Sequence, residues 1–107
     1  NVTWVISNPA IDTIPGQRTL GVAGTVIYIC GYAIGGTSVT FNIEKRAAAT
    51  GAGTNFMASD LTLTTGGVAC SSFADDEIPA HSWLLVDISA VSGAVEWVMI
   101  NLTYRVP

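Results

Sequence analysis

The sequence contains few side chains that could carry out chemistry. His81 is the only histidine, and no cysteine or carboxylate stands at a spacing from it that would complete a zinc site. A serine triad would also have to use His81, and no serine lies in a nucleophile-elbow motif. We therefore predict no catalytic residue, no metal ligand and no cofactor.

The carboxylates give two weaker alternatives. Asp75-Asp76-Glu77 is the only acidic cluster, but Ca²⁺ needs about six to eight oxygens and the cluster does not match an EF-hand loop. A solvated loop is the favoured interpretation. A glycoside hydrolase would need two carboxylates about 5–10 Å apart. Glu44, Asp60, Asp87 and Glu96 lie on or beside predicted strands, and the sequence does not show whether two of them converge. Glycoside hydrolase therefore ranks last among the functions considered.

The composition narrows the class of partner. The chain has 107 residues and a net charge of −4, and its four basic residues form no patch, which argues against nucleic acid. Its longest apolar run, Thr25 to Ile34, is far shorter than the roughly 20 residues of a membrane helix, so we expect no membrane insertion. Charged residues make up 11% and hydrophobic residues 50%. This excess of apolar surface favours an obligate oligomer, with a monomeric sandwich as the alternative.

The strongest pattern runs from Ile78 to Val106 and predicts two long strands joined by a short turn around Ser92 and Gly93. The core face would carry alternate residues of both strands, namely Leu84, Val86, Ile88, Val98, Ile100, Leu102 and Tyr104. A connection this short predicts that the two strands are antiparallel neighbours in a hairpin.

The opposite face of this predicted hairpin is also apolar, where a solvated sheet would carry polar residues. It contains Trp83, Leu85, Val95, Trp97 and Met99. A chain of this size has little material to cover a second apolar face, so another copy of the chain is the natural candidate. We therefore take Leu85, Val95, Trp97 and Met99 as the candidate oligomer interface.

The rest of the chain reads as short strands separated by turn residues. Strands are predicted at Val2–Ser7, Thr19–Ala23, Thr25–Ile34 with a bulge or bend at Gly31, Val39–Arg46, Phe56–Ala58, Leu61–Thr64 and Val68–Phe73. The segment Ala10–Arg18 is predicted as a loop or edge segment, and Ala47–Asn55 and Ala74–Ala80 as loops. With no convincing helix, this pattern predicts one all-β domain over residues 1–107, an antiparallel β-sandwich of about eight strands. Jelly roll is the favoured topology and an immunoglobulin-type sandwich the alternative, although no tryptophan lies between the two cysteines.

Cys30 and Cys70 both lie in apolar, strand-like surroundings. They are the only cysteines, and a bond between them would close a loop of about 40 residues and contribute about 4 kcal/mol on a chain-entropy model. Free cysteine is among the most buried residue types. We therefore favour two reduced thiols in the core, with a disulfide as the alternative.

Two stretches, GGTSVTFNIEKR (Gly35 to Arg46) and ADDEIPAHSWLLVDISAVSGAVEWVMINLTYRV (Ala74 to Val106), resemble a pattern common in bacteriophage tail-fibre and other virion appendage proteins. The chain departs from that pattern at His81-Ser82, where Gly-Asp is usual. The resemblance implies a compact β-sandwich, often a jelly roll, at the C-terminus of a longer fibre chain and assembled as a trimer.

The function that the resemblance implies is structural and adhesive. The protein would belong to the virion and recognise a host cell-surface glycan or protein through its loops. The resemblance transfers no binding residue, because the loops of such proteins do not align by motif. A carbohydrate-binding module of a secreted enzyme is the alternative, because the faces of Trp and Tyr side chains can stack on sugars.

Overall fold

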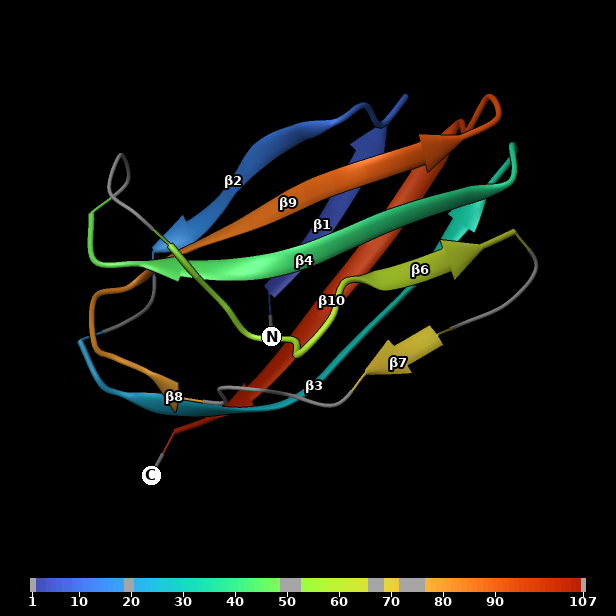
Figure 1. The fold of residues 1–107 in the computed structure, drawn as a ribbon. Helices are drawn as coiled ribbons and strands as arrows, with labels where there is room; N and C mark the ends of the chain where they lie inside the picture. Colours follow the sequence, from blue (N-terminus) through green and yellow to red (C-terminus); the bar gives the residue numbers. More distant parts are fainter. Residues whose placement is uncertain (1, 19–20, 49–52, 66–68, 72–76, 107) are drawn as a thin grey trace.

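The computed structural model describes residues 2–18, 21–48, 53–65, 69–71 and 77–106, and these residues form strands and connections without a helix. The strands are β1 (Val2–Ser7), β2 (Asp12–Arg18), β3 (Gly24–Ile34), β4 (Ser38–Arg46), β5 (Thr54–Asn55), β6 (Leu61–Thr64), β7 (Ala69–Ser71), β8 (Glu77–Ile78), β9 (Trp83–Ser92) and β10 (Trp97–Arg105) (Figure 1).

The strands form two antiparallel sheets. Sheet A has the order β1-β10-β3-β7, with β8 also paired to β3, and sheet B has the order β2-β9-β4-β5, with β6 also paired to β4. β7 and β8 pair with successive parts of β3, and β5 and β6 do the same along β4. We count β5 with β6, and β7 with β8, as one interrupted strand each, and renumber the strands in chain order. Sheet A then runs 1-8-3-6 and sheet B runs 2-7-4-5, which is the strand order of a jelly roll. The predicted antiparallel β-sandwich of jelly-roll type is confirmed.

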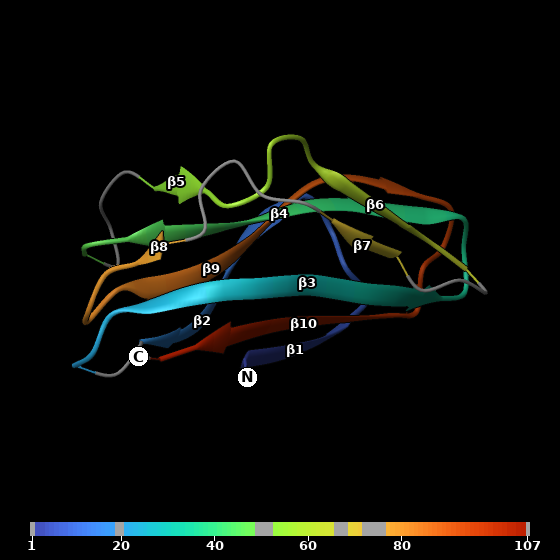
Figure 2. The same cartoon turned by 90° about the horizontal axis from the view of Figure 1, so that it is seen from below.

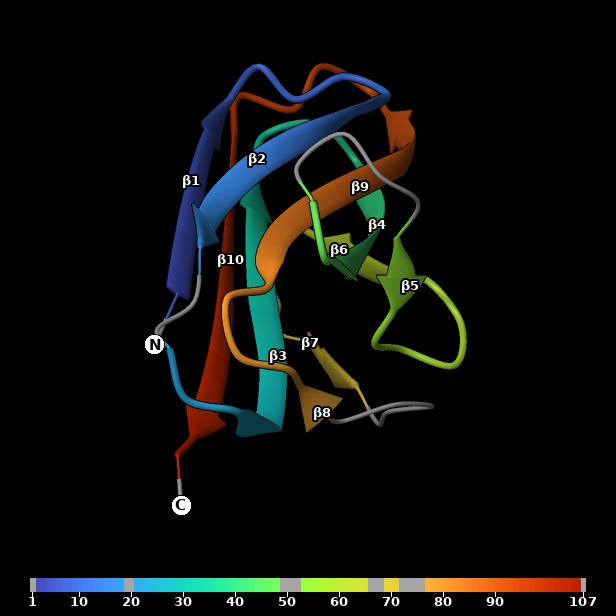
Figure 3. The same ribbon diagram turned by 90° about the vertical axis from the view of Figure 1, so that its left-hand side faces the viewer.

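The two sheets pack as layers with the core between them (Figures 2 and 3). Alternate side chains of three of the long strands, β4, β9 and β10, point into this core and are fully buried, namely Val39, Phe41, Ile43, Leu84, Val86, Ile88, Val98, Ile100 and Leu102. Large apolar side chains buried in this way each contribute about 1.5–3 kcal/mol. The core faces predicted for β9 and β10 are therefore correct.

The predicted hairpin of β9 and β10 is wrong, because the two strands lie in different sheets. β9 lies between β2 and β4 in sheet B, whereas β10 lies between β1 and β3 in sheet A (Figure 3). Residues 93–96 cross from one sheet to the other. A short connection with a glycine permits either arrangement. Here β9 pairs along the whole of β4, from Ser38 to Arg46, and β10 pairs along β3 from Thr25 to Ile34.

Two such crossings lie against each other at one end of the sandwich. The β3–β4 connection, residues 35–37, also passes between the sheets. It is joined to the β9–β10 connection by hydrogen bonds from Thr37 N to Ser92 O and from Glu96 N to Ile34 O, both 2.9 Å. Gly36 and Gly93 both have positive φ, +64° and +78°. Glycine is needed here because the two backbones approach closely in a conformation that other residues rarely adopt.

The segment between β5 and β6 is bonded to β4 by one buried amide side chain. Asn42 of β4 is 2% exposed, and its Nδ2 donates to Met57 O (3.2 Å) and to Asp60 Oδ1 (3.1 Å). Its Oδ1 accepts from the backbone N–H groups of Ile43 (2.9 Å) and Met57 (3.2 Å). The segment between the two short strands therefore bonds to β4 through this side chain.

Several strand boundaries differ from those predicted. β2 is an edge strand of sheet B, as one reading of Ala10–Arg18 allowed, and its register shifts between Pro15 and Arg18. The strands predicted at Thr19–Ala23 and Phe56–Ala58 do not form over residues 21–23 and 56–58, because those residues connect strands that pair elsewhere. The segments predicted as loops contain β5 and β8, which pair with the ends of β4 and β3. Residues 19–20, 49–52, 66–68 and 72–76, with the acidic pair Asp75 and Asp76, lie outside the described residues.

The bulge predicted at Gly31 is also misplaced. Gly31 pairs regularly with Ile100, and the register shift falls between Thr103 and Tyr104 instead. A Cβ at Gly31 would lie 2.5 Å from Met99 O. Gly31 therefore serves the close approach of β3 to β10 rather than a bend.

The prediction of reduced cysteines is wrong, because Cys30 forms a disulfide. Cys70, the only other cysteine of the sequence, is paired with Cys30 in the β3–β7 ladder. Residues that directly oppose each other in antiparallel strands have Cβ atoms about 4.5–5.5 Å apart. Two buried thiols were predicted from the apolar, strand-like surroundings of each cysteine. Such local patterns do not reveal which residues face each other across a sheet.

We expect the protein to contain no titratable thiol until it is reduced. A bond that joins the two cysteines of this chain closes a loop of about 40 residues, so reduction should lower the free energy of unfolding by up to about 4 kcal/mol. Intact mass measured with and without reductant should differ by two hydrogens, and thermal melting should shift downward on reduction. Two thiols that react in the denatured, unreduced protein would contradict this expectation.

Candidate functional site

The outer face of sheet A carries a group of apolar side chains on its three longest strands. In the register of the sheet, Val5, Met99 and Tyr32 form one row across β1, β10 and β3. Trp97 and Ile34 lie together in the next row. We call these five residues the apolar patch. Val5 is 57% exposed, Ile34 47% and Trp97 45%.

The alternation of the strands explains why these side chains point outward. On β10 the core residues are Val98, Ile100 and Leu102, so Trp97 and Met99 must face the other way. Directly paired residues in a sheet lie on the same face, which brings the neighbours from β1 and β3 beside them. The patch surrounds a shallow depression of about 270 Å³, lined by its five residues and Val98.

The outer face of sheet A around the apolar patch is uncharged. From the row of Trp97 to the row of Thr103, its outward positions on β1, β3 and β10 carry no charged residue. The other outward residues there are Thr3, Ser7, Tyr28, Cys30, Asn101 and Thr103. An antiparallel sheet with a solvated face normally shows polar alternation, and contiguous exposed apolar surface usually marks an interaction site.

The outer face of sheet B shows the usual polar pattern. Ser89 Oγ donates to Asp60 Oδ2 at 2.7 Å, and the hydroxyls of Thr40 and Thr62 lie 3.0 Å apart. Glu44 and Arg46 form an ion pair on the same strand. The outer face of sheet B therefore carries charged side chains, whereas the outward positions of sheet A around the apolar patch do not.

The structure separates the four residues predicted for the oligomer interface. Trp97 and Met99 lie in the apolar patch, but Leu85 is 7% exposed and Val95 is 6% exposed, so the prediction that these two face a partner is not supported. Val95 lies in the β9–β10 crossing rather than in a strand, and it packs in the core. Leu85 lies on β9, between β2 and β4, with Pro15 and Glu44 as its paired neighbours.

Three patch residues were not predicted. Val5, Tyr32 and Ile34 come from strands that were recognised in the sequence, and the run from Thr25 to Ile34 is apolar on both faces. A strand in a two-layer sandwich turns only one face to the core. Apolar residues on both faces of this strand therefore indicated that some of them are exposed. The register that places these residues beside Trp97 and Met99 could not be read from the sequence, because it depends on β10 pairing with β1 and β3.

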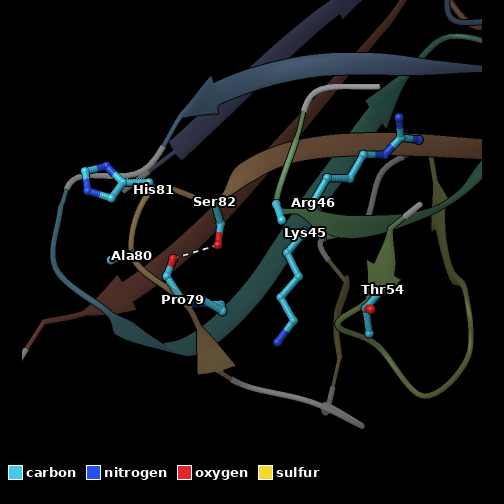
Figure 4. A pocket seen from close by; sticks show the side chains of 8 residues that line it. Lys45, Arg46, Thr54, Pro79, Ala80, His81 and Ser82 are labelled. Carbon is cyan, nitrogen blue, oxygen red and sulfur yellow. Dashed lines mark hydrogen bonds between the residues drawn. The ribbon is translucent and has the colours of Figure 1, made fainter. Parts of the chain in front are cut away.

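A second depression, of about 360 Å³, lies at the other end of the sandwich. It is lined by Lys45, Arg46, Ala47, Thr54, Pro79, Ala80, His81 and Ser82 (Figure 4). Ser82 Oγ donates to Pro79 O at 2.6 Å and fixes the turn before β9, in which His81 has a φ of +61°.

The basic side chains at this end pocket do not converge on one point. Figure 4 shows Lys45, Arg46 and His81 extending in different directions. Lys45 Nζ donates to Glu77 O and lies 5.5 Å from the centre of the Phe56 ring, and Arg46 pairs with Glu44. None of the described residues that line the pocket is a carboxylate. The arrangement therefore offers neither the paired carboxylates of a glycosidase nor a set of donors aimed at a single anion.

Two of the four carboxylates considered for chemistry are engaged in structural contacts. Asp60 accepts from Asn42 and Ser89, and Glu44 pairs with Arg46. Within the described residues, no three His, Cys, Asp or Glu side chains come together as metal ligands would. The described part of the chain also has no helix of the length and hydrophobicity needed to cross a bilayer.

Comparisons of the chain with protein-family models, with curated proteins and with solved structures each returned no match.

Proposed function

We propose that this chain is a structural and adhesion module of a bacteriophage virion, a trimeric head at the tip of a fibre that recognises a host cell-surface glycan or protein. The observation that carries the proposal is the uncharged apolar patch around Trp97 on the outside of a jelly roll. An exposed apolar surface of this kind is typical of a subunit interface. The partial resemblance of Gly35–Arg46 and Ala74–Val106 to fibre proteins supports the same function.

In this proposal the domain binds and does not catalyse. Association would cover the outer face of sheet A, and the connections at the ends of the sandwich would remain accessible to a receptor. Jelly rolls serve as viral capsid and lectin domains, which fits a fold that presents loops on a rigid scaffold.

The adhesive function can be tested by binding to whole cells. Fluorescently labelled protein should bind saturably to a subset of strains in a panel of Gram-negative and Gram-positive bacteria, and excess unlabelled protein should displace it. Heat-denatured protein serves as the control for non-specific adsorption. Equal, non-saturable signal on every strain, or none on any, would count against the adhesion function.

A carbohydrate-binding module is the second candidate, and one observation favours it. Trp97 and Tyr32 expose aromatic surface on a sheet face, where sugar rings could stack. This function predicts a monomer that binds a defined glycan through Trp97. A glycan array probed with the monomeric protein decides the point, because a monomer without hits would remove the main support for this candidate.

A further inference from the structure

We infer that the end pocket, between the β8–β9 turn and the end of β4, binds an anionic cell-surface glycan, with His81 as a contact residue. The inference rests on the proposed function, because it names the class of receptor and the part of the domain that meets it. It does not depend on how copies of the chain associate.

The fold gathers the basic residues of the sequence at this end of the sandwich. The strands β2, β4 and β10 all finish here, away from the two sheet crossings, and their last residues are Arg18, Arg46 and Arg105 (Figure 1). Lys45 directly precedes Arg46, and His81 lies in the turn before β9. These five are all the lysines, arginines and histidines of the chain. Because they are far apart in the sequence, only the fold brings them to one end.

The carboxylates are distributed differently. Among the described residues, two lie beside the basic end, Glu44 and Glu77, and four lie away from it, Asp12, Asp60, Asp87 and Glu96. Within the described part of the chain, basic residues therefore outnumber carboxylates at this end. On a chain with a net charge of −4, such a region attracts anions that the rest of the surface repels.

The shape of this end also fits a ligand. The end pocket of about 360 Å³ adjoins a second depression of about 330 Å³, and Pro79 and Ala80 line both. Concave sites for small molecules typically measure about 300–1,000 Å³. The side chains of Lys45, Arg46 and His81 extend in different directions (Figure 4). Divergent cations fit a polymer that carries several separate negative groups better than one compact anion.

His81 gives a second, independent observation. It has a φ of +61°, a conformation that costs stability in any residue except glycine. Backbone conformations of this kind cluster at ligand-binding sites, where function retains them. The turn that holds it is fixed by the bond from Ser82 Oγ to Pro79 O, and a Cβ at Gly21 would meet its ring at 3.1 Å. The structure thus presents an exposed imidazole at the edge of the pocket, although glycine would form the same turn without strain.

Nucleic acid is the polyanion that fits this end less well. Its affinity comes from lysine and arginine side chains that each neutralise a phosphate along an extended backbone. Here Arg46 is paired with Glu44, Lys45 donates to Glu77 O, and the basic residues surround a small depression. A surface glycan with occasional carboxylate or phosphate groups matches this arrangement better.

The inference is tested by biolayer interferometry on four immobilised polymers. Polygalacturonate carries carboxylates and poly(glycerol phosphate) carries phosphates, whereas dextran is neutral and double-stranded DNA represents nucleic acid. His81→Gly removes the imidazole, Lys45→Gln removes a charge and Lys45→Arg keeps it. Asn8→Gly is the matched control for His81→Gly, because Asn8 also has a positive φ, +50°, and lies at the opposite end, where its N–H donates to Glu96 O.

We expect the wild type to bind at least one of the two acidic polymers and not dextran, and to bind more weakly as salt is raised, because salt screens exposed charges. His81→Gly should bind about 10-fold more weakly, as expected for one lost hydrogen bond to a charged group. Its melting temperature should stay at or above that of the wild type, because glycine adopts the positive φ freely. Lys45→Gln should also bind more weakly, whereas Lys45→Arg and Asn8→Gly should bind like the wild type.

Binding to neither acidic polymer would overturn the inference, as would equal binding to DNA. Folded His81→Gly and Lys45→Gln variants that both bind like the wild type would also overturn it. The cell-binding assay separates this inference from the proposed function. A protein that adheres to cells but binds neither acidic polymer refutes the anionic-glycan site alone, and one that binds an acidic polymer but adheres to no strain refutes the adhesion function alone.

Discussion

Replacing Gly36 by alanine should destabilise the fold by about 2–5 kcal/mol, the largest effect that we expect from a single added methyl group. Gly36 has a φ of +64°, and a Cβ there would lie 2.6 Å from Val95 N, 2.7 Å from Val95 Cγ2 and 2.9 Å from Ala94 C. The left-handed conformation costs a non-glycine residue about 1–2 kcal/mol. Overpacking against a fixed neighbour adds about 1–3 kcal/mol. The neighbour cannot move away easily, because it is the backbone of the other sheet crossing.

Two further glycines separate the causes of this loss. Gly35 also has a positive φ, +75°, but its nearest obstacle is the Glu96 side chain at 3.1 Å, so Gly35→Ala should show mainly the conformational cost. A Cβ at Gly21 would meet the His81 ring at 3.1 Å, and Gly21 has no positive φ, so Gly21→Ala should be the mildest of the three. Urea denaturation of the three variants gives the free energies. Equal stability of Gly36→Ala and Gly21→Ala would show that the two crossings are not packed as described.

Replacing Asn42 by alanine should cost about 2–4 kcal/mol of stability. The side chain is 2% exposed and makes four hydrogen bonds. Three of them join β4 to Met57 and Asp60, and the fourth is accepted from the N–H of Ile43 within β4. Its removal leaves the N–H and C=O of Met57, itself 3% exposed, without these partners. Each buried polar group left unsatisfied costs about 1–3 kcal/mol.

The same strand offers a matched control for Asn42. Thr40 lies two residues away on the same face of β4, and its hydroxyl bonds only to that of Thr62. Thr40→Ala should therefore cost no more than about 1 kcal/mol, as expected for one exposed hydrogen bond. Asn42→Asp keeps the acceptor but removes both donors and adds a charge beside Asp60, so it should also be strongly destabilising. An Asn42→Ala variant as stable as Thr40→Ala would contradict the buried network.

The class of fold could be predicted because it depends on local patterns. Turn residues separate the strands, and the alternation of Val39, Phe41 and Ile43 and of Val98, Ile100 and Leu102 defines their core faces. Strand boundaries such as Val2–Ser7 and Leu61–Thr64 were also correct. These features report on residues within one strand, which is why a single sequence suffices for them.

The features that could not be predicted depend on pairing between distant strands. The connection after Ser92 fits a hairpin or a sheet crossing equally well, and only the partners β4 and β3 decide between them. The pairing of Cys30 with Cys70 and the gathering of Val5 beside Met99 follow from the same long-range registers. The sequence identified Trp97 and Met99 as outward residues but gave no means of separating them from the buried Leu85 and Val95.

The central claim is that the face of sheet A around Trp97 is covered by other copies of the chain. The solution mass of the wild-type protein, measured by light scattering at several concentrations, tests it most directly. We predict a trimer, three times the chain mass of 11.1 kDa, whose mass stays constant as the protein is diluted through the micromolar range. A mass of 11.1 kDa at every concentration would contradict the claim, because the apolar patch would then be solvated in the free protein.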